Sequence, residues 1–263
     1  MVASPRPVDF DQRLPDVIRG DFDRSFRGLF RPHGSIETDR SLRVRTGLSH
    51  PFGNLAFSNR SPSADEVAGD IAELLEDSFP SAYMCTEPIG SEAASILAAS
   101  GFVLAEDMPL MALDLAQLEV PNAPDGCRIT RATAALHDDW VDAMANGYEL
   151  PRSLVDPMGP RELGDRMDGD PIEFHVVHYG ETPVASSFFT IRNGVIGVYC
   201  IATDPAHRGR GIGAWATSAP LRMLRDAGHH TAVLQSSLQG APVYRRLGFS
   251  EHGTMPLYVR IPG

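Results

Sequence analysis

The chain has 263 residues, of which 43% are hydrophobic and 22% are charged, and its formal net charge is −11. The length suits two domains of about 100–150 residues each, and the negative charge argues against a nucleic-acid backbone as a partner. No run approaches the roughly 18 consecutive apolar residues of a membrane helix, and residues 1–20 show no signal peptide, so we expect a cytoplasmic protein with no membrane partner.

The N-terminal half contains two helical patterns followed by a strand. Residues 64–77 and residues 91–100 have the apolar spacing of helices, and Gly101 follows the second pattern as a helix stop. Residues 111–115 then alternate in the manner of a strand. This order of helix, glycine and strand is the first copy of a repeat.

Two short motifs recur at equal spacing along the chain. Gly101-Phe102 and Met108-Pro109-Leu110 return as Gly248-Phe249 and Met255-Pro256-Leu257, each pair 147 residues apart. Chance can repeat one short motif, but two motifs repeated at one offset indicate a duplicated unit.

The surroundings of the second copy match those of the first. A helical stretch over residues 241–247 precedes it, and a strand over residues 258–261 follows it. We therefore predict two related halves, residues 1–122 and residues 123–263. Proline, asparagine and glycine cluster in the linker at residues 120–126.

The C-terminal half reads as helices around an antiparallel meander. We expect helices over residues 132–146, 161–167 and 213–226, and strands over residues 174–179, 183–191, 195–203 and 232–236. Asn193-Gly194 is a strong signal for a tight hairpin, because both residues tolerate positive φ. Gly228 is the expected stop of the last long helix, and Pro220 inside that helix predicts a kink or a break.

The loop from Thr203 to Gly213 carries the clearest chemistry. Its glycines at 209, 211 and 213 allow a sharp turn close to a ligand. Their N–H groups and the first turn of the next helix form an anion site, and Arg208 and Arg210 add charge that can bind in a bidentate manner. A pyrophosphate fits such a site.

Two common phosphate loops fit this segment less well. The nucleotide-triphosphate loop needs a lysine, and the sequence contains none. The dinucleotide fingerprint follows the first strand of a parallel sheet and has an acidic residue about 20 positions later. Here the loop follows an antiparallel meander, and Leu234 lies near that distance.

A third pattern fits. Arg208-Gly-Arg-Gly-Ile-Gly213, the preceding Ile201-Ala-Thr-Asp-Pro205 and the later Val243-Tyr-Arg-Arg-Leu-Gly-Phe249 resemble the GNAT superfamily of N-acetyltransferases over residues 128–263. The resemblance implies an α+β fold of two GNAT-like domains, each a mostly antiparallel central sheet flanked by helices. It implies that acetyl-coenzyme A is bound and its acetyl group passed directly, in a ternary complex, to a primary amine of a small molecule.

The resemblance also implies roles for individual residues. The pyrophosphate would lie on Arg208, Gly209, Arg210, Gly211, Ile212, Gly213 and Ala214. The pantetheine arm would pair with Ile201, Ala202 and Thr203, and the N–H of Ile201 would stabilise the oxyanion. The strand ending at Ser236 would diverge from its neighbour to admit the thioester. Tyr244 would contact the cofactor and protonate the departing thiolate as the general acid.

The N-terminal half lacks these features. Leu97 stands where the repeat would place the tyrosine, and residues 50–54 lead to the next helix without an R-x-x-G-x-G loop. We therefore expect this half to be a degenerate copy that binds no cofactor and that covers the active half or shapes its acceptor cleft.

Other candidate residues leave the general base open. A water chain, Tyr199 or Glu149 could serve. His175 and His178, three apart on a strand, should face opposite sides and not share a metal. The three cysteines are far apart, so no zinc site or disulfide framework is expected, and Cys200 fits a packed strand position. We predict no metal.

Two other functions fit the same residues. The chain could sense acyl-coenzyme A without transferring the acyl group, although Tyr244 argues for transfer. It could also acylate protein amines, for which the acidic composition suits a basic substrate. Neither reading predicts an oligomeric state.

Overall fold

In a computed structural model, the described residues are 13–262. Residues 1–12, part of the stretch for which no signal peptide is expected, lie outside them. One twelve-stranded sheet runs through the molecule, in the order β1-β2-β3-β4-β12-β5-β11-β10-β9-β8-β6 with β7 beside β8. Its strands are β1 Ile36–Glu37, β2 Ser41–Arg45, β3 Asn54–Ser58, β4 Ser81–Cys85, β5 Val103–Asp114, β6 Cys127–Ala132, β7 Arg166–Met167, β8 Asp170–Tyr179, β9 Thr182–Arg192, β10 Val195–Thr203, β11 Thr231–Gln235 and β12 Ser250–Arg260.

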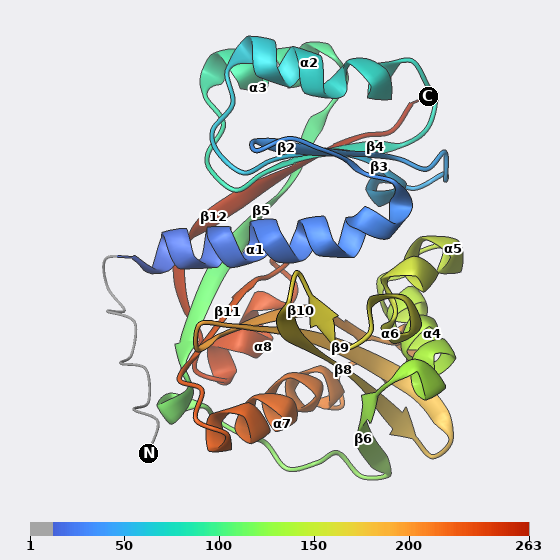
Figure 1. The fold of residues 1–263 in the computed structure, drawn as a ribbon, viewed down its shortest axis with the longest axis vertical. Coiled ribbons are helices and arrows are strands. Elements are labelled where there is room, and N and C mark those ends of the chain that lie inside the picture. Colours follow the sequence, from blue (N-terminus) through green and yellow to red (C-terminus); the bar gives the residue numbers. More distant parts are fainter. Residues whose placement is uncertain (1–12, 263) are drawn as a thin grey trace.

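The helices gather around the two ends of this sheet and across its middle. Figure 1 shows α2 and α3 over one end, α4 to α8 around the other, and α1 crossing between them. The helices are α1 Leu14–Phe30, α2 Ala64–Leu75, α3 Ser91–Ala99, α4 His137–Tyr148, α5 Arg152–Val155, α6 Pro160–Leu163, α7 Ile212–Asp226 and α8 Ala241–Arg246. This is the expected mixed α/β arrangement, with a mostly antiparallel sheet flanked by helices. Within residues 13–262, no helix has the length and apolar character needed to cross a membrane.

The C-terminal half is built on an antiparallel meander, as predicted. Strands β6, β8, β9 and β10 pair in this order, and β11 then runs parallel to β10. Asn193 (φ 49°) and Gly194 (φ 80°) make the hairpin between β9 and β10, the conformation that the Asn-Gly pair favours. Neighbouring residues of β9 face opposite layers, so that Phe188 packs with α1 and α4 whereas Phe189 packs with α7 and α8.

The two halves exchange their last strands at the centre of the sheet. β5, from the N-terminal half, lies between β11 and β12, whereas β12, from the C-terminal half, lies between β4 and β5. In the antiparallel β5–β12 pair, Met108 stands opposite Met255, its own counterpart in the sequence repeat. A pseudo-two-fold axis therefore passes through this pair, and each half needs the strand of the other to complete its sheet.

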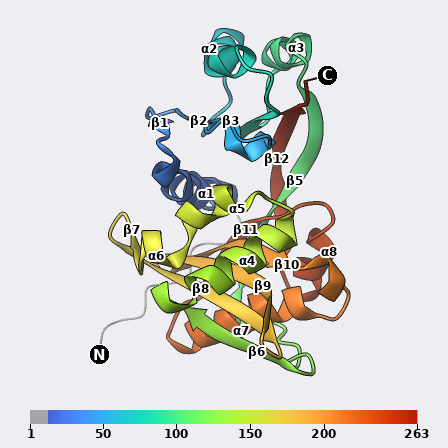
Figure 2. The same cartoon turned by 90° about the vertical axis from the view of Figure 1, so that its right-hand side faces the viewer.

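The first helix, α1, has no counterpart among the sequence predictions. Ile18, Phe22, Phe26 and Leu29 recur every three or four residues and are all buried, the pattern of a helix with one apolar face. Figure 1 and Figure 2 show α1 between the end of the sheet that carries α2 and α3 and the end surrounded by α4 to α8. The helix therefore fills the space between the two halves.

A buried ion pair fastens α1 to the C-terminal half. Asp21 accepts hydrogen bonds from Arg192 (3.0 Å) and Tyr199 (2.5 Å), and Arg192 also bonds Ser25 at 2.9 Å. Gly197 leaves the room for this contact, because a Cβ there would lie 2.0 Å from an oxygen of Asp21.

Several predicted boundaries need correction. The helix expected over residues 161–167 ends at Leu163 and is followed by β7. The strands expected over residues 111–115 and 258–261 are the ends of longer strands that begin at Val103 and Ser250. Pro220 does not break α7, which runs from Ile212 to Asp226, and Gly228 (φ 100°) follows it.

Candidate active site

The site begins where two parallel strands separate. β10 and β11 pair only from Val195 to Gly197 on the first strand, and then diverge. Just beyond this point β10 bulges between Tyr199 and Ala202, and Cys200 has a φ of 52°. Bulges change the direction in which backbone groups point. The strands thus leave the gap that was expected before the strand ending at Ser236.

Two cavities meet at this gap. One of about 550 Å³ is lined by the loop before α7 and by α8, and we call it the loop cavity. The other, of about 390 Å³, lies toward α1 and α4, and we call it the apolar cavity. Both volumes are in the range of ligand sites. The residues common to both linings are Tyr148, Ile201, Ser237, Gly240 and Tyr244.

The loop cavity has free backbone donors. Within the described residues, the N–H groups of residues 209 to 214 donate no hydrogen bond. Gly209 and Gly211 have φ values of 76° and 78°, which glycine adopts without strain. The last three of these N–H groups belong to the first turn of α7, where the helix dipole favours an anion. The loop therefore has the free donors that an anion site needs.

The two loop arginines differ in position. Arg208 lines the loop cavity. Its guanidinium also bonds the carbonyl oxygens of Thr203 (3.1 Å) and Gly147 (2.7 Å) and so holds the loop against the end of α4. Arg210 lies over the ring of Tyr179, at 5.9 Å from its centroid, and does not line the loop cavity. Arg246 lines the cavity instead. The sequence analysis missed Arg246, although it lies two residues after Tyr244 on the helix that carries the predicted acid.

Tyr244 lies at the junction of the two cavities. It is 9% exposed, and its ring meets Phe249 edge-on at 5.8 Å. Its hydroxyl bonds no described residue and is not among the fully buried polar atoms, so it is open to the cavities that the residue lines. Burial raises the pKa of Tyr244 above its ordinary value, so the hydroxyl stays protonated at neutral pH and can donate its proton.

The remaining predicted contacts divide between the cavities. Ile201 lines both, and Ala202 and Thr203 line the loop cavity. Ser236 lines only the apolar cavity, and its hydroxyl bonds the carbonyl of Ser237 at 2.8 Å. Ser236 was expected to contact the cofactor where the strands diverge to admit the thioester, and it lies on the apolar-cavity side of that gap.

The two side chains suggested as general base differ in position. The hydroxyl of Tyr199 is held by Asp21, and burial raises its pKa well above the ordinary value. A tyrosine that cannot ionise is a poor base, so this suggestion is wrong. Glu149 lines the loop cavity but not the apolar cavity. Glu106, on β5, lines the apolar cavity and was missed, because only the strand exchange brings it there.

The N-terminal half has a capped helix start where the C-terminal half has free N–H groups. Ser63 caps α2, and its hydroxyl and the side chain of Glu66 bond each other's backbone N–H groups. A carboxylate at this position places a negative charge at the helix start, which disfavours an anion. Leu97, at the position equivalent to Tyr244, is fully buried in the core. These features agree with a half that binds no cofactor.

The histidines are engaged by the protein. His175, against the ring of Phe189, and His178, 2.9 Å from Asp139, reach opposite layers as expected. Burial lowers the pKa of His175 to about 4. Burial also raises the pKa of the Cys200 thiol to about 12, so it is a weak nucleophile.

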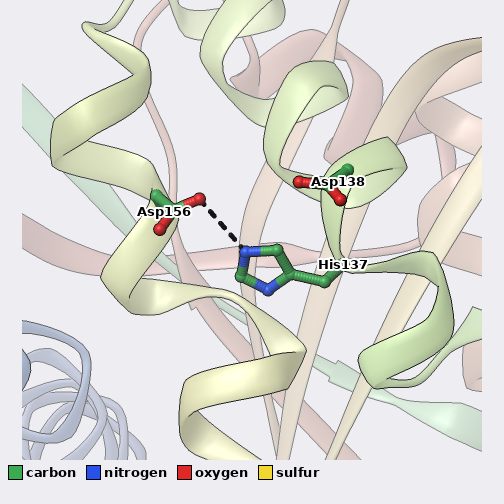
Figure 3. Close-up of side chains that lie close together, drawn as sticks. All are labelled: His137, Asp138 and Asp156. Carbon is green, nitrogen blue, oxygen red and sulfur yellow. Dashed lines mark hydrogen bonds and ion pairs between the residues drawn. The ribbon is translucent and has the colours of Figure 1, made fainter.

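Figure 3 shows the cluster of His137, Asp138 and Asp156. Nδ1 of His137 accepts the N–H of Arg161, and Nε2 lies 3.2 Å from Asp156. Asp138 is paired with Arg161 and Arg152. Because both ring nitrogens already have partners, we assign no metal to this cluster.

Comparison with known proteins places this geometry in a family. Residues 135–249 match the family model of the Acetyltransferase (GNAT) family. This part of the chain, less than half of its length, matches a GNAT domain. It contains strands β8 to β10 of the meander, the glycine loop and Tyr244.

The relatives include proteins named mycothiol acetyltransferase. That of Catenulispora acidiphila is 28% identical over 181 residues, covering 63% of this chain and 57% of the relative. That of Streptomyces avermitilis is 30% identical over 162 residues, covering 57% and 50%. The chain spans about half the length of the curated relatives it matches.

Solved structures extend the likeness in fold to both halves. A GCN5-related N-acetyltransferase from Kribbella flavida has a TM-score of 0.62 at 21% identity, covering 94% of this chain and 96% of that one. A tandem GNAT protein from the clavulanic acid biosynthesis pathway has a TM-score of 0.57 at 12% identity, covering 92% and 88%.

Proposed function

We propose that this protein transfers the acetyl group of acetyl-coenzyme A directly to a primary amine of a small molecule. The observation that carries the proposal is the meeting of two unsatisfied features at one gap. The residues with free N–H groups that line the loop cavity are Gly209 and residues 211 to 214, and Tyr244, whose hydroxyl bonds no described residue, lines both that cavity and the apolar one. The first suits a pyrophosphate and the second suits a leaving thiolate.

The cofactor would lie along the bulged strand. Its pyrophosphate binds at the N-terminus of α7, and its pantetheine arm follows residues 201–203 in the manner of an added strand. The acetyl group then enters the gap between β10 and β11. There the N–H of Ile201 would face the developing oxyanion.

The overall reaction releases one proton. A neutral amine attacks the thioester carbon, a C–N bond forms, and the C–S electron pair leaves with the sulfur. Tyr244 gives its proton to the thiolate and regains one from the nitrogen of the new amide. The amine enters as an ammonium ion, and the proton that it loses before the attack goes to a base and then to water.

The two halves would divide this work. Residues 123–263 supply the cofactor site and Tyr244. Residues 1–122, the degenerate half, supply α1 and β5 to the acceptor side and bind no second cofactor. The capping box at the start of α2 supports this assignment.

Calorimetry with acetyl-coenzyme A tests the cofactor site. Gly211→Asp adds a carboxylate to the loop at a φ that Asp tolerates, and we expect at least a hundredfold loss of affinity. Gly180→Asp is the matched control, since Gly180 also has positive φ and open space around it but does not line the loop cavity. Equal binding by the two variants would contradict the proposed site.

A second candidate is the reaction named in the relatives, that of a mycothiol acetyltransferase. It rests on sequence similarity over part of those proteins. A sensor of acyl-coenzyme A is a third. Binding of acetyl-coenzyme A without release of free thiol, over a broad panel of amines, would favour the sensor.

A further inference from the structure

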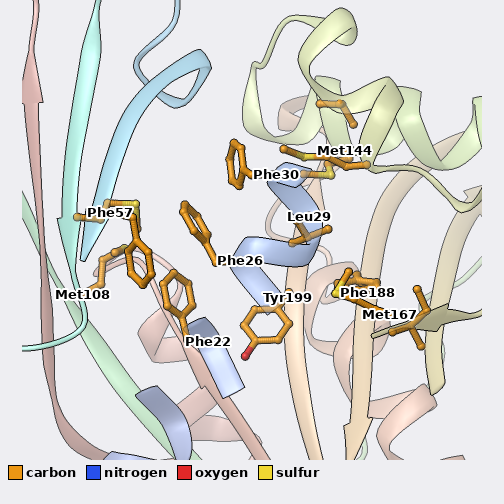
Figure 4. Packing of buried hydrophobic residues seen from close by; sticks show 14 of the residues in the cluster. Phe22, Phe26, Leu29, Phe30, Phe57, Met108, Met144, Met167, Phe188 and Tyr199 are labelled. Carbon is orange, nitrogen blue, oxygen red and sulfur yellow. The ribbon is translucent and has the colours of Figure 1, made fainter. Parts of the chain in front are cut away.

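The apolar cavity is walled by hydrophobic side chains from both halves. Phe22, Phe26, Leu29 and Phe30 of α1 form one wall, and Met144 of α4 lies on the other. Figure 4 shows the three phenylalanines following one another along α1, with Met144 near Phe30. A site of this composition excludes water from most of its surface and favours an apolar guest.

Several polar side chains also line this cavity. Tyr244, Ser236, Gln235 and Glu106 all line the cavity. Among the described residues that line it, Glu106 is the only carboxylate. The side-chain oxygen of Gln235 is buried and has no hydrogen-bond partner among the described residues. Such orphan acceptors are uncommon in folded proteins, and they point to a donor that the site receives.

Glu106 and Gln235 lie on neighbouring strands. Gln235 ends β11 and pairs with Leu110 of β5, and Glu106 lies four residues before Leu110 on β5. One oxygen of Glu106 accepts the N–H of Leu238, in the turn that leads to α8 and Tyr244. The carboxylate is therefore fixed beside the gap, and its other oxygen has no bond to a described residue.

We propose, on the basis of the acetyl transfer above, that the acceptor is a primary amine on an apolar alkyl or aryl body. The apolar body lies against the phenylalanines of α1. The ammonium group is bound by Glu106 and by the side-chain oxygen of Gln235.

Glu106 then has a chemical task as well as a binding task. An alkylammonium has no lone pair with which to attack, so it must first lose a proton. The Glu106 carboxylate takes that proton and passes it to water, and the freed lone pair attacks the thioester. The base that the sequence left open would thus come from the N-terminal half.

The test is a panel of amines with saturating acetyl-coenzyme A and the unaltered protein. Burying one methylene group is worth about 0.8 kcal/mol, so kcat/KM should rise about fourfold per methylene from butylamine through hexylamine to octylamine. Glucosamine, a polar primary amine, should be a much poorer acceptor. A flat series, or a preference for glucosamine, would overturn the inference.

The variant Glu106→Gln tests the carboxylate. Gln keeps an acceptor for the N–H of Leu238 but removes the charge. We expect kcat/KM for octylamine to fall at least tenfold. The matched substrate is 4-butylaniline, whose amine is uncharged at neutral pH and needs no prior deprotonation, and its kcat/KM should change less than threefold. Equal losses for both substrates would show that Glu106 only holds the turn.

Two further results separate this inference from the proposed function. If the protein binds acetyl-coenzyme A and acetylates glucosamine but no alkylamine, the transferase function is supported and the apolar acceptor is excluded. Faster release of free thiol from octanoyl-coenzyme A than from acetyl-coenzyme A, with butylamine as acceptor, would assign the cavity to the acyl chain and overturn the inference. If calorimetry detects no binding of acetyl-coenzyme A, the proposed transferase function and the inference about its acceptor are both contradicted.

Discussion

Replacing Tyr244 with Phe tests the chemistry of the gap with little disturbance of the fold. The substitution removes one hydroxyl and keeps the ring that packs against Phe249. Because that hydroxyl bonds no described residue, its removal breaks no hydrogen bond within residues 13–262. We therefore expect the free energy of unfolding to change by no more than about 0.5 kcal/mol.

The expected loss of rate is much larger. Proton transfer by a positioned acid contributes about 10²- to 10⁴-fold to a rate, which corresponds to about 3 to 5 kcal/mol of the barrier. Burial raises the pKa of Tyr244 above its ordinary value, so the acid form persists to alkaline pH. In the unaltered protein, kcat should therefore not fall between pH 7 and pH 10.

The assay measures release of free thiol from acetyl-coenzyme A, with octylamine as acceptor. Affinity for acetyl-coenzyme A is measured by calorimetry and stability by urea unfolding. The reasoning holds if kcat falls at least a hundredfold while affinity and stability stay nearly constant. An unchanged kcat in a folded variant that binds the cofactor would show that the thiolate leaves without Tyr244.

Further predictions concern stability and assembly. Asp21→Ala removes the buried carboxylate that accepts from Arg192 and Tyr199, while Arg192 keeps Asp170 at 2.9 Å, so the free energy of unfolding in urea should fall by about 1 to 3 kcal/mol. Adding Arg192→Met should recover part of this loss, and a double variant no more stable than the single would contradict it. Burial lowers the pKa of His175 to about 4, so below pH 6.5 the unfolded chain binds a proton that the folded chain does not bind. The free energy of unfolding should therefore fall by up to about 3 kcal/mol between pH 6.5 and pH 4. The variant His175→Gln should show a smaller fall, and an unchanged pH profile would exclude His175 as its cause. Residues 123–263 expressed alone should show no cooperative thermal transition, because β11 and β12 both lack β5, and coexpression with residues 1–122 should restore it; a cooperative transition in the isolated half would argue against the exchange.

The parts of the structure that sequence could predict are those fixed by local chemistry. Asn193-Gly194 makes its hairpin because both residues accept positive φ wherever they occur. The loop before α7 is open because its glycines and the helix start leave N–H groups unpaired. The expectation for Tyr244 came instead from the resemblance of residues 243–249 to the GNAT family.

Long-range contacts decided the features that the sequence analysis missed or misjudged. The side chain of Arg208 bonds Gly147 and that of Arg210 lies on Tyr179, and neither partner is near in sequence. The helix α1 did have a readable apolar period at Ile18 and Phe22, but its role depends on packing between the two halves.

The repeat predicted that the halves are related but not how their sheets join. Equivalent strands β5 and β12 carry similar patterns, so the sequence cannot distinguish pairing within a half from exchange between halves. In the structure Met108 pairs with Met255, so β5 and β12 are exchanged between the halves. This pairing places Glu106 of the N-terminal half in the cavity that Tyr244 also lines. A half that has lost its own loop would then be retained for two reasons. Its strand β5 completes the sheet of the C-terminal half, and its helix α1 and Glu106 line the apolar cavity in which we place the acceptor.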